Sequence, residues 1–124
     1  MAFQQIQAAR LRFLPAARLP RQLRRRIEPA IDDLVAQLAG ATGSEELAGA
    51  RRALESVRAE LSRHGGPGEP CILTKEAVFA LSEQLEAASR LLARAGWHAA
   101  SLVPAAVDDR LLALVAELQP VAPA

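Results

Sequence analysis

Two stretches of the chain repeat their apolar residues at alternating steps of three and four positions, over 47–61 and over 78–95. This spacing brings side chains onto one face of an α-helix and is typical of helices that pack side by side. The first stripe consists of Leu47, Ala50, Leu54, Val57 and Leu61, and the second of Val78, Leu81, Leu85, Ala88, Leu92 and Ala95. The pattern predicts two amphipathic helices with one buried face each.

Local signals set the limits of the first of these helices. Thr42 with Glu45 matches a capping box, and Ser44 is an equally good N-cap residue, so both starts stay open. The helix is expected to end before the Gly- and Pro-rich stretch HGGPGEP at 64–70, which reads as a loop.

The second helix carries clearer signals at both ends. Thr74 is the expected N-cap, and Leu73 and Val78 then stand at the two positions of a hydrophobic staple. Arg94 and Gly96 mark the C-terminus, because a basic residue favours the negative end of the helix dipole and glycine favours the turn beyond it.

A third helix is expected upstream, because apolar residues follow one helical face from 19 to 38. They are Leu19, Leu23, Ile27, Ile31, Leu34 and Leu38. Pro29 leaves two alternatives, since proline cannot bond to the carbonyl four residues earlier. Either one kinked helix covers about 20–39, or the helix begins at Pro29. In the second case Asp32 and Asp33 lie near its start and favour its dipole. Gly40 ends it.

The last helix is expected from about Pro104 to Gln119, after a connecting segment over 97–103. Asp108 and Asp109 then lie in its early turns. The side chains expected to face inward are Val107, Leu111, Leu114, Val115 and Leu118.

Composition favours helices throughout, because Ala (27) and Leu (19) dominate the apolar residues while Ile numbers four and Tyr none. At 124 residues the chain is expected to form one domain. The sequence therefore predicts an all-α antiparallel helical bundle of about four helices over 19–119. Residues 1–18 are expected to form a basic, mobile arm or a short extra helix, and 120–124 a frayed tail.

Charge is distributed unevenly along the chain. The first 27 residues carry seven arginines and no acid, whereas the remainder carries eight basic and fourteen acidic residues. Such asymmetry indicates an arm that meets an anionic partner or its own acidic body. In the body-facing interpretation the arginines mostly lie on solvent-facing helix positions. The alternative is contact with nucleic acid or with a membrane surface. The candidate contact residues are Arg18, Arg21, Arg24, Arg25 and Arg26.

No catalytic, metal or cofactor site is predicted. His64 and His98 are the two histidines, and no spacing of His, Cys, Asp or Glu matches a set of metal ligands. The single Cys71 has no partner for an internal disulfide and is expected to serve as a small apolar residue. The pairs at 32–33 and 108–109 are adjacent on helices, where successive side chains point about 100° apart, so neither pair converges on a substrate.

The chain is therefore expected to act by binding, as an adaptor or regulatory module whose partner is another protein or a second copy. Nucleic-acid or membrane-surface binding is the alternative, and no small-molecule substrate is indicated. Phe79, Leu91 and Leu112 lie off the main stripes and would form an adhesive patch if exposed together. No apolar run suits a membrane span or a secretory signal, which predicts a cytoplasmic location. Heavy use of Ala, Arg and Leu is typical of GC-rich bacteria.

Overall fold

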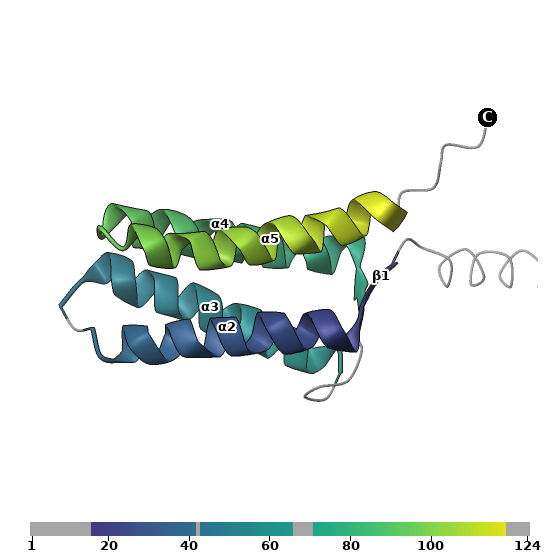
Figure 1. Ribbon diagram of the computed structural model, residues 1–124, viewed down its shortest axis with the longest axis horizontal. Helices are drawn as coiled ribbons and strands as arrows, with labels where there is room; N and C mark the ends of the chain where they lie inside the picture. The colour runs from purple at the N-terminus through teal and green to yellow at the C-terminus, as the bar shows by residue number, and fades with distance from the viewer. Residues whose placement is uncertain (1–15, 42, 66–70, 119–124) are drawn as a thin grey trace, which may run out of the picture.

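The computed structural model describes residues 16–41, 43–65 and 71–118, and in this part of the chain four long helices lie side by side (Figure 1). Each helix runs opposite to the one before it, as the predicted antiparallel all-α bundle requires. The helices are α2 (Arg21–Ala39), α3 (Glu45–Arg63), α4 (Lys75–Arg94) and α5 (His98–Leu118). Of the arm or extra helix predicted over 1–18, residues 1–15 lie outside the described residues, as does the predicted tail at 120–124, whereas 16–18 belong to a strand and correct that prediction.

A short two-stranded sheet closes one end of the bundle and was not predicted. Strand β1 (Ala16–Leu19) pairs antiparallel with β2 (Cys71–Thr74), so that Leu19 stands opposite Cys71. The placement of Leu19 on a helix face is therefore wrong, although its side chain is fully buried, as is that of Leu73. A strand of four residues is too short to show a recognisable sequence pattern, and its pairing depends on a distant segment of the chain.

Pro29 and Pro104 both lie inside helices. Pro20 is the N-cap of α2, and α2 then continues through Pro29, which decides for the single long helix. Helix α5 begins at His98 and contains Pro104, so the connecting segment expected over 97–103 is helical. Tertiary packing explains why neither helix breaks, because Ile27 and Ile31 on either side of Pro29 are buried in the core.

This placement corrects the interpretation of the carboxylate pairs. Asp32 and Asp33 lie in the middle of α2, and Asp108 and Asp109 in the middle of α5, while the first turn of each helix holds no acid. They do not stabilise helix starts. The roles of these four carboxylates follow from the side chains that they contact in the bundle.

The capping predictions for the two central helices hold. The Ser44 hydroxyl accepts the Leu47 N–H at 3.3 Å, which settles the choice of N-cap for α3. Thr74 accepts the Ala77 N–H at 3.1 Å at the start of α4. At the end of α4 the chain turns at Gly96, whose φ of 84° is a conformation that glycine adopts without strain. The Trp97 N–H then bonds to the Leu92 carbonyl at 2.9 Å.

The core follows the two predicted stripes. Every residue of the α3 stripe is buried, and so is every residue of the α4 stripe except the half-buried Ala95. Helix α4 lies between α3 and α5 and packs closely against both, and α2 packs against α3. Helices α2 and α5 make the fewest contacts of any two neighbours in the bundle. The side of the bundle between these two helices is the one that remains open.

Candidate functional site

A groove runs along the open side of the bundle, between α2 and α5. It consists of two adjoining cavities of about 660 and 310 Å³ that share Ala30 and Val103. Because the two helices are antiparallel, the first half of α2 faces the middle of α5, and the second half of α2 faces the start of α5 (Figure 1). From Arg26 to Gln37 the groove covers about 16 Å of helix axis.

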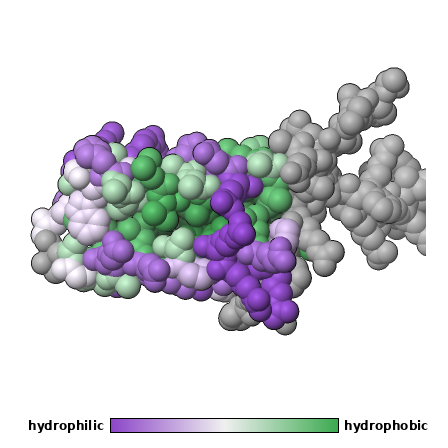
Figure 2. All heavy atoms as spheres, in the orientation of Figure 1, coloured by the Kyte–Doolittle hydropathy of each residue, from purple (hydrophilic) through white to green (hydrophobic). Residues whose placement is uncertain are grey.

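The floor of the groove is apolar. Ile27 and Leu34 come from α2 and Val107 from α5; all three are buried, and the half-buried Val103 lies between them. On the face drawn in Figure 2, apolar side chains gather in a strip between α5 and α2. Hydrophilic side chains cross this strip near the N-terminal end of α2.

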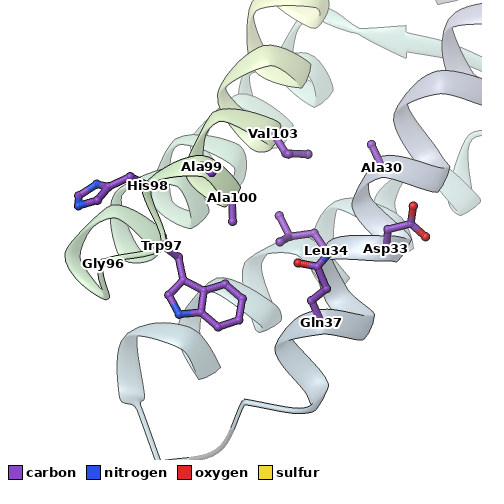
Figure 3. A pocket seen from close by; sticks show the side chains of 10 residues that line it. All are labelled: Ala30, Asp33, Leu34, Gln37, Gly96, Trp97, His98, Ala99, Ala100 and Val103. Atoms are coloured by element: carbon purple, nitrogen blue, oxygen red, sulfur yellow. The ribbon is translucent and has the colours of Figure 1, made fainter.

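Small side chains on the facing walls keep the groove open. Ala30 on α2 stands across from Ala100 and Ala106 on α5. Figure 3 shows Ala100 and Val103 directed toward Leu34 and Ala30, with space between them. A methyl group is too short to fill the distance between two helices, so the backbones remain accessible.

The two ends of the groove differ in chemistry. At one end the Trp97 side chain points toward Leu34 and Gln37 of α2 (Figure 3), and Trp97 is half-buried against the core. Asp33 belongs to this end and is exposed. At the other end Arg26 and Arg110 stand on opposite walls, and both are exposed. The groove is therefore acidic at one end and basic at the other.

The predicted contact arginines divide into two kinds. Arg21, Arg25 and Arg26 are exposed on α2, and no ion pair links them to a carboxylate within the described part of the chain. Arg24 is 1% exposed, so the expectation of a solvent-facing position is wrong for this residue. The side chain of Arg18 lies outside those that the structure describes.

Arg24 is buried because it ties α2 to the C-terminal end of α3. Its Nε donates to the carboxylate of Glu28, and its Nη2 donates to the Gly65 carbonyl at 2.9 Å. Glu28 also forms an ion pair with Arg58 of α3, whose Nη1 lies 3.2 Å from the carboxylate, and Arg58 Nε donates to Asp32 at 2.6 Å. The i,i+4 spacing of Arg24 and Glu28 signals the pair in the sequence, whereas the carbonyl at the end of α3 is visible only in the fold.

Asp108 is a second charged residue that sequence reasoning missed. It is 6% exposed between α4 and α5, and burial raises the pKa of its carboxyl. A hydrogen bond from Ser82 lowers this pKa, and the charges of Glu86 and Asp109 raise it further. A buried carboxyl beside other acids disfavours its charged form, which makes it a point of pH sensitivity in the α4/α5 interface.

The remaining candidates stay separate. His64 lies 3.1 Å from Glu60, and His98 is exposed and points away from the groove (Figure 3). The described residues contain no group of three or more His, Cys, Asp or Glu placed to hold a metal ion. The side chain of Cys71 lies outside the described set. No helix within the described ranges is long and apolar enough to cross a membrane.

The off-stripe apolar residues do not form the predicted patch. Phe79 is exposed, with the Lys75 ammonium 5.8 Å from its ring centre, whereas Leu91 and Leu112 are only partly exposed. Phe79 and Leu91 also stand about 18 Å apart along the axis of α4. Leu102 is the most exposed large apolar residue in the described part of the chain, at 68%, and it lines the α2/α5 groove.

Comparison with known proteins found no matching family model, no similar curated protein and no similar solved structure. The α2/α5 groove is therefore the feature from which a function is inferred.

Proposed function

We propose that this protein is a non-enzymatic interaction module that binds a helix of another protein in the α2/α5 groove. One observation carries the proposal: a groove lined by the exposed Leu102 and the half-buried Val103 lies between the two neighbouring helices that make the fewest contacts in the bundle. An adaptor or regulatory role in the bacterial cytoplasm belongs to the same proposal.

The shape of the groove supports a helical occupant. Two antiparallel helices with small residues on their facing walls leave a straight channel, and a third helix fills such a channel by inserting its side-chain ridge. This ridge would cover the exposed Leu102 and the half-buried Val103, above a floor of side chains that are already buried. Burial of apolar surface is the main favourable term in such docking.

A third cavity in the described part of the chain is less suited to a partner. It measures about 510 Å³ and lies between the start of α3 and the end of α4. Its walls carry the charged side chains of Glu45, Glu46, Arg52 and Arg94, with Leu91 as the one large apolar residue. Charged rims contribute little to affinity without a desolvated apolar centre.

A displayed library of helical peptides of about 12–14 residues, a length matched to the groove, tests this proposal. Peptides selected on the full chain are expected to lose binding to Ala106→Glu, because the new side chain fills the groove and charges its wall. They should retain binding to Ala80→Glu, a matched change at an exposed position of α4 outside the groove. Circular dichroism checks that both variants fold.

Two results would count against it. The first is a selection that yields no binders, and the second is a set of binders that Ala106→Glu does not affect. Sedimentation of the chain alone identifies a further case: association of two copies that Ala106→Glu abolishes would make a second copy the occupant.

A second candidate function is nucleic-acid binding through the exposed Arg21, Arg25 and Arg26, which lack acidic partners within the described residues. Fluorescence anisotropy with a short DNA duplex tests it. Affinity should fall steeply with salt and should weaken in an Arg21→Gln/Arg25→Gln variant. Binding that ignores salt or the variant would exclude this candidate.

A further inference from the structure

We propose that the occupant of the α2/α5 groove is an amphipathic helix that carries an acidic side chain at the end seated between Arg26 and Arg110. This inference rests on the proposed function and specifies the chemistry of the partner. It follows from the charges at the two ends of the groove.

The basic end is built from two helices. Arg26 of α2 and Arg110 of α5 line the same cavity of about 310 Å³, above Ile27 and Val107. Neither arginine is paired with a carboxylate among the described residues. Two guanidinium groups on opposite walls repel each other, and a carboxylate between them would accept hydrogen bonds from both. Partial desolvation by the apolar floor strengthens such a contact.

The nearest acids do not supply this carboxylate. Asp109 is adjacent to Arg110, but it is absent from the cavity lining, as expected for a side chain turned about 100° around α5. Asp33 belongs to the other cavity, two helical turns along α2. Among the side chains that the structure describes, none supplies this carboxylate, and we assign it to the occupant.

The other half of the groove carries one acid at its rim, and its carboxylate is directed away from α5 (Figure 3). Asp33 is exposed there and forms no ion pair within the described part of the chain, and it is the one acidic residue on either cavity lining. A lysine or arginine about two turns from the acidic residue of the occupant would reach it. The apolar stripe of the occupant lies between these two charges, over Ala30 and Val103.

Charge and shape also argue against the two occupants that the chain itself offers. The segment at 1–15 carries Arg10 and Arg12 and no acid, so it has nothing to place between Arg26 and Arg110. A second copy that docks groove to groove about a two-fold axis brings the same concave surface and the same two arginines, so it leaves the groove unfilled and supplies no carboxylate.

Three synthetic peptides test the inference on the full chain. All share one helical apolar stripe of about 12–14 residues and one lysine, and they differ at a single position two turns away, which is Glu, Gln or Lys. The Glu peptide is expected to bind about tenfold more tightly than the Gln peptide, and the Lys peptide more weakly still. Fluorescence anisotropy measures the three affinities.

Charge reversal in the protein provides the decisive control. Arg26→Glu/Arg110→Glu should invert the ranking, so that the Lys peptide binds best. Arg90→Glu/Arg94→Glu changes the net charge equally at exposed positions of α4 and should preserve the original ranking. Added salt should compress the differences among the peptides.

The possible failures are distinguishable. Equal affinities of the three peptides, all abolished by Ala106→Glu, would overturn the charge assignment and leave the proposed function standing. Binding of the Glu peptide that survives Ala106→Glu would place it outside the groove and overturn the inference. Displacement of all three peptides by a DNA duplex, without preference among them, would assign the arginines to nucleic acid instead. Absence of binding by any peptide or library member would remove the proposed function itself.

Discussion

The α3/α4 interface and the α2/α5 interface are formed by helices of similar length, yet one is closed and the other remains open. In the closed interface Leu54 and Leu85 are fully buried, and leucine or valine occupies most positions of the two stripes, with Ala50 and Ala88 among them. In the open one Ala30, Ala100 and Ala106 stand on the facing walls. Leucine is long enough to fill the 8–10 Å between helix axes, and alanine is not. The size of the residues at the edge of a stripe therefore decides whether an interface closes.

The largest expected effect comes from placing a charge in each of the two interfaces. Leu85→Asp should unfold the protein, because an unpaired carboxylate in the closed core costs several kcal/mol. Leu102→Asp introduces the same group at the edge of the open groove, and the free energy of unfolding should change by only about 0.5 kcal/mol. Circular dichroism and urea denaturation measure both. A comparable loss in the two variants would mean that the groove is part of the core.

The second effect concerns the buried Arg24–Glu28 pair, which attaches α2 to α3. Arg24→Met should lower the free energy of unfolding by about 3 kcal/mol, because it leaves Glu28 buried with one partner fewer. Arg24→Met/Glu28→Met should recover much of this loss, since both charges are gone.

Arg25→Met, at the exposed neighbouring position, serves as the control and should stay within about 0.5 kcal/mol of the wild type. Urea denaturation gives all four values. If Arg24→Met were as stable as Arg25→Met, the polar network would not anchor α2 to α3.

The smallest effect lies in the closed α4/α5 interface. Burial raises the pKa of the Asp108 carboxyl above the 3.8 of an unperturbed group. The folded state therefore binds this proton more tightly than the unfolded state, and stability present at low pH is lost as the pH rises through the folded pKa. Asp108→Asn should remove this loss and stabilise the protein at neutral pH by roughly 1 kcal/mol.

Thermal denaturation across the acidic range checks this expectation, with Asp33→Asn at an exposed position of α2 as the control. A variant that follows the wild-type pH dependence would show that Asp108 titrates as an exposed group does.

The sequence by itself determined the two central helices and their ends. The stripes over 47–61 and 78–95, the N-cap at Thr74 and the turn at Gly96 all lie where the pattern predicts them. Ser44 was one of two equal candidates for its cap. These features are local, because periodicity, capping and glycine conformation depend on residues a few positions apart.

Only the tertiary structure decided the rest. The β1–β2 pairing joins segments far apart in the chain. The helices continue through Pro29, where local signals left a start open, and through Pro104, where they favoured a start. The burial of Arg24 and Asp108 and the gap between α2 and α5 depend on which helix faces meet and how closely they approach. Periodicity identifies the buried face of each helix but contains no information about the distance to the helix opposite, and that distance creates the groove.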